Sequence, residues 1–191
     1  MAIKGFQKEI NSKEDIIHYF EKGCKKIDQL NIGVEHEKLL FFKKNNKRIN
    51  YETISKVFNF LTKFGWKSIR EKKNIIALSK NKQNISLEPG NQIELSGAQH
   101  KSVHLICEES YKFLEELKKA CSKFNLKMMS VSYDPLTNLN KVPENPKQRY
   151  KIMKEEMPKH GTLSLDMMYQ TCGTQINLDY TSEKDFIKKF K

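Results

Sequence analysis

The spacing of apolar residues predicts five helices. Apolar side chains recur every three or four positions in the segments 13–29, 51–64, 100–125 and 147–157, and again after Ser182. Ser12, followed three residues later by Asp15, is typical of a capping box that begins the first helix. Gly65 is typical of the residue that ends a helix, so the second helix is expected to stop there.

Strand-like segments separate these helices. Residues 32–42 read as a strand with apolar residues at both ends, and residues 172–180 alternate between polar and apolar positions. Between the second and third helices, short strands connected by turn-like residues predict an antiparallel meander. The short strands of this meander are expected at 66–70, 75–79, 85–88 and 92–96. A further strand is expected at 128–132, after the third helix. The pattern as a whole predicts an α+β fold with an antiparallel β-sheet and flanking helices.

Length and composition limit the class of protein. The chain has 191 residues, of which 38% are hydrophobic, and it contains no internal repeat and no linker rich in Pro, Gly or Ser. We therefore expect residues 1–191 to form a single domain. The apolar runs are only a few residues long, so no membrane span is expected.

The N-terminal segment and the cysteines indicate the compartment. Residues 1–20 carry mixed charges and lack an apolar stretch followed by small residues, which argues against a secretory signal. The four cysteines include no C-x-x-C pair, so they are interpreted as reduced thiols rather than a disulfide framework. Together these features predict a cytoplasmic protein.

The formal charge of +12 suggests nucleic-acid binding as one possibility. However, only Arg48, Arg70 and Arg149 are arginines, and the remaining basic residues are lysines scattered along the chain. Base and phosphate recognition through paired hydrogen bonds favours arginine. We therefore expect no specific nucleic-acid partner, and a lysine-rich surface that mildly attracts anionic substrates.

Four glutamates are the candidate chemical groups. Glu35 and Glu37 lie two apart in a strand, so both carboxylates point to one face. Glu88 and Glu94 flank the turn at Pro89-Gly90-Asn91. Four converging carboxylates favour Mg²⁺ or Mn²⁺. The competing interpretation is that these glutamates face solvent and pair with lysines.

Several motifs resemble glutamate–cysteine ligase of the plant and proteobacterial type, in the family's order. They are Ile-Gly-Val-Glu-His-Glu-Lys (32–38), Ser-Leu-Glu-Pro-Gly-Asn-Gln-Ile-Glu-Leu-Ser-Gly-Ala (86–98), Arg-Tyr-Lys-Ile-Met (149–153), Met-Pro (157–158), Leu-Asp-Met-Met (165–168), Thr-Cys (171–172) and Gln-Ile-Asn-Leu-Asp-Tyr (175–180). One departure is Asn91, where the family has a second glycine. Asparagine tolerates the left-handed backbone region, so the turn is expected to survive this change.

The resemblance implies the first step of glutathione biosynthesis. ATP phosphorylates the γ-carboxylate of glutamate, and the amine of cysteine displaces phosphate to form γ-glutamylcysteine. The implied fold is similar to glutamine synthetase, an antiparallel sheet whose active face carries metal-binding carboxylates. By this likeness, Glu35, Glu37, Glu88 and Glu94 would hold Mg²⁺ or Mn²⁺ between ATP and glutamate.

Weaker assignments concern four further residues. Arg149 lies in the family's Arg-Tyr motif and is a candidate catalytic contact to a carboxylate or phosphate, although a surface ion pair is equally compatible. Gln92 shares a face with Glu94, and Gln175 and Asn177 share a face of the last strand. These three are candidates for binding substrate or ATP, or for satisfying neighbouring backbone groups.

The resemblance also implies that the chain is the N-terminal part of a longer catalytic domain, with a sheet that is incomplete at its C-terminal end. The expected partners are small molecules: ATP, L-glutamate and L-cysteine, with no membrane. Oligomeric state stays open. Two alternative functions also stay open, namely a related carboxylate–amine ligase with another acceptor and a non-catalytic remnant that binds nucleotide and metal.

Overall fold

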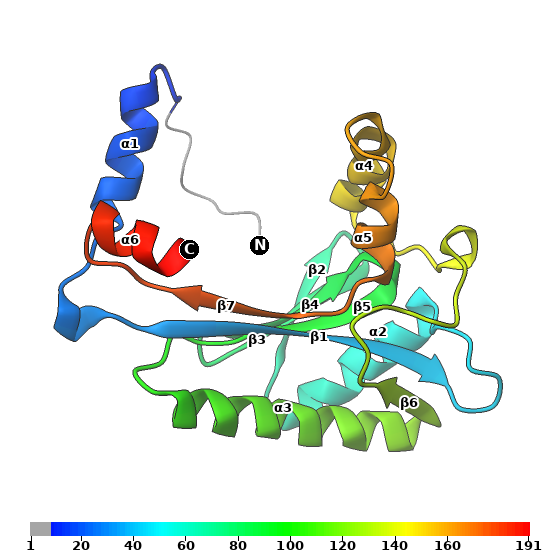
Figure 1. Ribbon diagram of the computed structural model, residues 1–191. Coiled ribbons are helices and arrows are strands. Elements are labelled where there is room, and N and C mark those ends of the chain that lie inside the picture. The colour runs from blue at the N-terminus through cyan, green and yellow to red at the C-terminus, as the bar shows by residue number, and fades with distance from the viewer. Residues whose placement is uncertain (1–8) are drawn as a thin grey trace.

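The computed structural model describes residues 9–191 and contains a seven-stranded sheet in which every pair of neighbouring strands is antiparallel (Figure 1). Five strands follow the order β2-β3-β4-β5-β1, and both β6 and β7 pair with β1. The strands are β1 (Ile32–Phe42), β2 (Lys67–Glu71), β3 (Asn74–Lys80), β4 (Gln83–Glu88), β5 (Gln92–Ser96), β6 (Leu126–Met129) and β7 (Thr174–Leu178). The predicted α+β class with an antiparallel sheet is confirmed.

Strand β1 connects the whole sheet. It pairs with β5 along residues 35–38, with β7 along residues 32–36 and with β6 along residues 39–42. An eleven-residue strand is long enough to hold three partners at once. The position of every other strand therefore depends on the register of β1.

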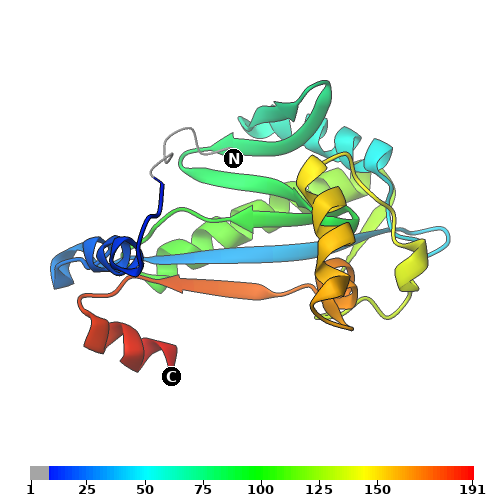
Figure 2. The same ribbon diagram turned by 90° about the horizontal axis from the view of Figure 1, so that it is seen from above.

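Helices cover one face of the sheet and leave the middle of the other face open. Helices α2 (Tyr51–Leu61) and α3 (Val103–Lys123) pack beneath the sheet in Figure 1. On the other face, α4 (Gln148–Glu156) and α5 (Ser164–Gln170) stand at one end. Helices α1 (Lys13–Lys22) and α6 (Glu183–Phe190) lie at the opposite end. Figure 2 shows this middle, which no helix of residues 9–191 covers and which we call the open face.

The main hydrophobic core lies between the sheet and helices α2 and α3. Alternate strand residues point into it and are almost fully excluded from water, as expected for strand alternation. Among its members are Leu40, Ile54, Phe58, Leu61, Ile75, Leu78, Ile85, Leu87, Ile93, Leu95, Phe113 and Leu117. In β4 and β5 these residues take one parity, so the other parity faces the opposite side, whereas Ile75 and Leu78 of β3 are three residues apart beside the bulge in the β2–β3 pair.

The predicted strands agree with the structure to within two or three residues, and two helix ends are as expected. Ser12 and Asp15 form the predicted capping box at the start of α1. Gly65 has a φ of +89° and ends the short 3₁₀ turn that follows α2. The turn at Pro89–Asn91 contains Gly90 at φ +64° and Asn91 at φ +60°, so asparagine does adopt the left-handed region there.

Two predictions about helices were wrong. The first helix ends at Lys22 rather than near residue 29, and it buries no side chain. Its apolar face, which includes Ile16, Ile17 and Phe20, is exposed. Helix α5 was not predicted, because its seven residues are too few to display a clear period.

The remaining sequence-based expectations concern membranes and cysteines. Within residues 9–191, no helix combines the length and apolarity needed to cross a membrane. All four cysteines are free thiols, as expected. Residues 1–8, part of the segment tested for a secretory signal, lie outside the described residues.

We predict that Leu40→Ala strongly destabilises the fold. Leu40 is 1% exposed, and its side chain packs between the central strand and the helices. Its removal leaves a cavity that costs about 2–5 kcal/mol of unfolding free energy. Chemical denaturation measures this change. The matched control is Leu163→Ala, because Leu163 is 72% exposed and its truncation is expected to change stability little; equal effects of the two variants would contradict the assignment of the core.

Candidate active site

Strand alternation places Glu35 and Glu37 on the open face. Leu40 points into the main core, so residues of opposite parity on β1 point away from it. Leu39 and Phe41 follow the glutamates on that side and pack against Cys172 in a separate small cluster. The apolar end of β1 is therefore covered on both sides, whereas its acidic end reaches the open face.

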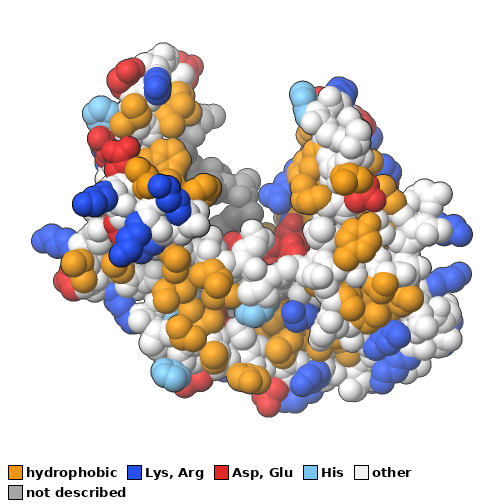
Figure 3. Space-filling model, in the orientation of Figure 1, with side chains coloured by type: hydrophobic (Ala, Val, Ile, Leu, Met, Phe, Trp, Pro, Cys, Tyr) orange, Lys and Arg blue, Asp and Glu red, His pale blue; other side chains and the backbone are white. Residues whose placement is uncertain are grey.

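Sheet register brings the second pair of glutamates beside the first. Glu37 lies directly opposite Glu94 on β5, and Glu94 lies opposite Ser86 on β4. Directly opposed side chains have Cβ atoms about 5 Å apart, and like charges in that position destabilise a sheet. Figure 3 shows acidic side chains at the bottom of the hollow between the two raised ends of the molecule.

Three of the four carboxylates are held by neutral donors. Glu94 accepts hydrogen bonds from the hydroxyls of Ser96 at 2.8 Å and Ser86 at 3.4 Å. Glu37 accepts from the backbone N–H of Gly173 at 2.6 Å. Glu35 accepts from the side-chain amide of Asn177 at 3.4 Å. These donors orient the carboxylates without neutralising their negative charges.

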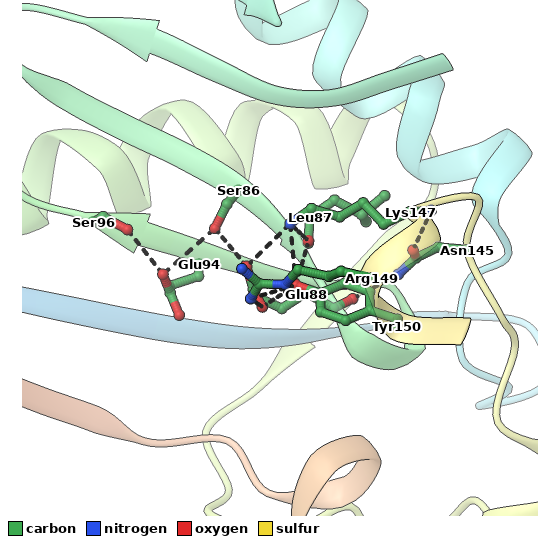
Figure 4. Close-up of polar contacts among 9 residues, drawn as sticks. All are labelled: Ser86, Leu87, Glu88, Glu94, Ser96, Asn145, Lys147, Arg149 and Tyr150. Carbon is green, nitrogen blue, oxygen red and sulfur yellow. Dashed lines mark hydrogen bonds and ion pairs between the residues drawn. The ribbon is translucent and has the colours of Figure 1, made fainter. Parts of the chain in front are cut away.

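Glu88 has a different environment, because cations reach it (Figure 4). Its carboxylate accepts hydrogen bonds from Ser86 at 2.8 Å and from the Tyr150 hydroxyl. Lys147 Nζ lies 3.5 Å from one carboxylate oxygen, and Arg149 Nη2 lies 3.8 Å from the other. The Arg149 side chain is 65% exposed, so most of its guanidinium remains available to a ligand.

The segment before α4 also holds the backbone of Leu87 and Glu88. Asn145 donates from Nδ2 to the Glu88 carbonyl at 2.9 Å. Lys147 donates from Nζ to the Leu87 carbonyl at 2.7 Å, and Tyr150 donates to the same oxygen at 3.2 Å. These contacts fix the end of β4 against the base of α4.

Burial, together with neighbouring charges, changes the acidity of Glu94, Glu37 and Lys147. Burial, followed by the charge of Glu88, raises the pKa of Glu94 to about 7, and the charges of Glu35 and Glu37 contribute in the same direction. Burial is also the main cause of the raised pKa of Glu37, opposed by its bond to Gly173. Burial lowers the pKa of Lys147, while the charge of Glu88 opposes that change. The four predicted carboxylates therefore sense one another's charges.

A metal-ligating geometry is not preformed. Among residues 9–191, no three His, Cys, Asp or Glu side chains form a group able to hold a metal ion. The serine, amide and tyrosine donors hold the carboxylates individually, and mutual repulsion keeps them from a common point. The donor set nevertheless has the chemistry that a hard divalent cation requires, since carboxylate oxygens are its preferred ligands.

The structure also places the predicted polar contacts. Gln175 lies opposite Glu35 in the β1–β7 pair, and Asn177 bonds to Glu35. Gln92 lies opposite Glu88 and is buried, and its Oε1 atom has no hydrogen-bond partner among the described residues. An unpaired buried acceptor is costly, so this oxygen is suited to receive a donor from a bound molecule.

Several residues at the site were missed by the sequence analysis. Strand parity already places Ser96 on the face of Glu94, and the same alternation identifies Ser86, which was missed, on the face of Glu88. Tyr150 follows Arg149 directly in the Arg-Tyr motif. Asn145 and Lys147 lie in a loop whose path has no periodic signal, and only the fold brings them to β4.

Comparison with known proteins identifies the family. The sequence model of glutamate-cysteine ligase family 2 (GCS2) matches residues 31–191. The chain belongs to this family. It is 42% identical to the chloroplastic glutamate–cysteine ligase of Medicago truncatula over 94% of the chain. It is 41% identical to ligase A of Oryza sativa subsp. japonica and 40% identical to the Arabidopsis thaliana enzyme, each over the same share.

The chain spans about a third of the length of the curated relatives it matches, with 36% of the Medicago enzyme covered. These ligases are named chloroplastic, which contradicts the predicted cytoplasmic location. The physical reason is that the absence of an apolar N-terminal stretch argues only against a secretory signal. Plastid targeting segments are amphipathic and rich in Ser and Arg, so the same test does not detect them.

We predict that Glu94→Gln stabilises the metal-free protein at neutral pH. The pKa of Glu94 is about 7 in the folded state and near 4.5 in the unfolded chain. Below pH 4.5 the carboxyl is protonated in both states. As the pH rises through 7, ionisation favours the unfolded chain and stability is lost. The glutamine variant avoids this loss, and we expect a gain on the order of 1 kcal/mol, because water still screens this partly buried carboxylate.

Thermal unfolding in a chelator at pH 4 and pH 8 measures the effect. The expected result is a higher unfolding midpoint for Glu94→Gln at pH 8, with little difference at pH 4. The matched control is Glu115→Gln on the exposed side of α3, which is expected to leave the pH dependence unchanged. A variant less stable than the wild type at pH 8 would show that the carboxylates do not repel one another.

Proposed function

We propose that the protein containing this chain is a glutamate–cysteine ligase that catalyses the first step of glutathione biosynthesis. In this reaction ATP phosphorylates the γ-carboxylate of glutamate, and the amine of cysteine attacks the acyl phosphate to release phosphate. Membership of the ligase family supports the reaction class. The names of the relatives support cysteine as the acceptor.

The opposition of Glu37 and Glu94 is the observation that carries the proposal. Two carboxylates in this position cost stability, and the nearest donors to them are neutral. Such an arrangement is stable when a cation binds between the charges. If these glutamates served only to stabilise the sheet, we would expect a lysine or arginine opposite each of them rather than a second carboxylate.

We infer that Glu35, Glu37, Glu88 and Glu94 hold Mg²⁺ or Mn²⁺. When bound, the metal supplies positive charge that offsets the phosphate groups of ATP and the carboxylate of glutamate. Within the chain, Ser96 and Gly173 orient two of the ligands before the metal arrives. This preorganisation reduces the entropy lost on metal binding.

Four further side chains are proposed to contact substrates. Arg149 lies beside Glu88 and is largely exposed, so its guanidinium is placed to bind a carboxylate or a transferred phosphate. Gln92, opposite Glu88 in the sheet, offers a buried oxygen without a hydrogen-bond partner among the described residues. Gln175 and Asn177 line the opposite side beside Glu35 and are suited to polar groups of glutamate or ATP.

We predict that Glu37→Gln lowers ligase activity by about a hundredfold or more. Glutamine keeps the size of the side chain but removes one of the opposed charges that bind the cation. Phosphate release that depends on ATP, glutamate and cysteine measures the activity of the full-length protein. The Mg²⁺ concentration needed for half-maximal rate is expected to rise in the same variant.

The control is again Glu115→Gln, which is expected to keep wild-type activity. Wild-type rates in both Glu37→Gln and Glu94→Gln would overturn the metal assignment. Replacing cysteine with other amino acids tests the acceptor, since a related carboxylate–amine ligase would prefer another amine. Metal-dependent nucleotide binding without phosphate release in any substrate mixture would instead indicate a non-catalytic remnant.

A further inference from the structure

A buried arginine touches the turn that separates two of the proposed metal ligands. Arg48 is 5% exposed and lies between β1 and α2. Its Nη2 atom donates to the carbonyl of Gly90 at 2.9 Å. Its Nη1 atom donates to the carbonyl of Tyr169 at 2.8 Å and to Asp134 Oδ2 at 3.2 Å. One guanidinium therefore joins the β4–β5 turn, the loop before α4 and the end of α5.

The turn is fitted closely to this guanidinium. Gly90 has a φ of +64°, and a Cβ atom at this position would lie 2.6 Å from Arg48 Nη2. The next residue, Asn91, donates from Nδ2 to the carbonyl of Ile49 at 3.1 Å. Arg48 and its neighbour Ile49 thus hold two successive residues of the turn.

Asp134 fixes the other side of the contact. Its second carboxylate oxygen accepts the backbone N–H groups of Leu136 at 2.8 Å and Thr137 at 3.1 Å. The side chain is fully buried, so the ion pair with Arg48 is shielded from water. The guanidinium therefore cannot move unless the loop at 134–137 moves with it.

The position of this turn determines where the proposed site residues stand. Glu88 precedes it directly, and Gln92 and Glu94 follow it within β5. A displacement of the turn would change the separation of Glu88 from Glu94 and move the unpaired oxygen of Gln92. Among residues 9–191, the hydrogen bonds of the Arg48 guanidinium go to Asp134 and to the carbonyls of Tyr169 and Gly90, not to these side chains, so its influence acts through the backbone.

We propose that Arg48 is a positioning residue for the carboxylate site: its guanidinium holds the β4–β5 turn so that Glu88 and Glu94 can bind one divalent cation. This role rests on the proposed function, because it assumes that these carboxylates bind a metal. Lysine cannot replace arginine here, because a single ammonium does not reproduce a planar fork whose two nitrogens contact three separate oxygens.

The test compares Arg48→Lys with Arg70→Lys in the full-length protein. Arg70 also donates to a main-chain carbonyl, that of Lys73 in the β2–β3 turn, so it is a matched arginine contact away from the site. The measurement is Mn²⁺ binding to chelator-treated protein without substrates, followed by the electron paramagnetic resonance signal of free Mn²⁺. Circular dichroism and thermal unfolding establish that each variant is folded at the assay temperature.

The expected result is a dissociation constant for Mn²⁺ raised about tenfold or more in Arg48→Lys and unchanged in Arg70→Lys. In activity assays of the same variant, we expect a lower kcat and a higher metal concentration for half-maximal rate. The KM for cysteine is expected to change less. A purely structural role would lower the unfolding midpoint but leave Mn²⁺ affinity of the folded protein unchanged, and that result would overturn the proposal.

Asp134→Asn is the second variant, used if Arg48→Lys does not fold. It keeps an oxygen for Leu136 and Thr137 but removes the charge that orients Arg48. Weaker Mn²⁺ binding by this folded variant supports the proposal, and unchanged binding overturns it. Failure of the wild-type protein to bind Mn²⁺ would be seen before any variant is compared, and it would overturn the metal assignment itself.

Discussion

The opposition of Glu37 and Glu94 across two neighbouring strands is the constraint on which the rest of the open face depends. Strand alternation prevents either carboxylate from turning to the other face: Ile93 and Leu95 beside Glu94 fill the core, and His36 beside Glu37 faces α3, where its Nε2 lies 3.1 Å from Ser110 Oγ. The sheet therefore carries a local repulsion that its own register creates. The hydroxyl of Ser96 and the N–H of Gly173 reduce the cost without removing the charge.

The negative charges at the two ends of the group formed by Glu88, Glu94, Glu37 and Glu35 are compensated to different extents. At one end, Glu88 is reached by Lys147 and Arg149, so its charge is already partly compensated. At the other end, Glu35 is bonded only weakly by Asn177. A cation entering the hollow would thus gain most from Glu35, Glu37 and Glu94. Glu88 would contribute less net charge to the same cation, and its neighbour Arg149 is exposed on that side, where an anionic part of a substrate can reach it.

Much of this arrangement follows from local sequence patterns, and the rest depends on tertiary contacts. Period-two alternation is sufficient to put the four glutamates on one face, and Gly65 and Ser12 mark helix ends by their own backbone chemistry. Alternation gives parity but not register, so it cannot show that Glu37 lies opposite Glu94. Helical periodicity likewise identifies the apolar face of α1 but not whether that face is buried. Contacts such as Lys147 with Leu87 join segments 60 residues apart and leave no local signal.

The arginines carry a signal that the total charge conceals. Lysines dominate the basic residues of this chain, and a flexible ammonium satisfies most surface positions. The three arginines make different contacts, and Arg48 uses several donors of its guanidinium at once. Arg48 bonds three oxygens at once, and Arg70 closes a hairpin turn. Arg149 stands beside Glu88 with its guanidinium largely exposed. Because lysine dominates the basic residues, the net charge says little about binding partners. The position of an arginine says more, because it marks a place where the geometry of the guanidinium is used.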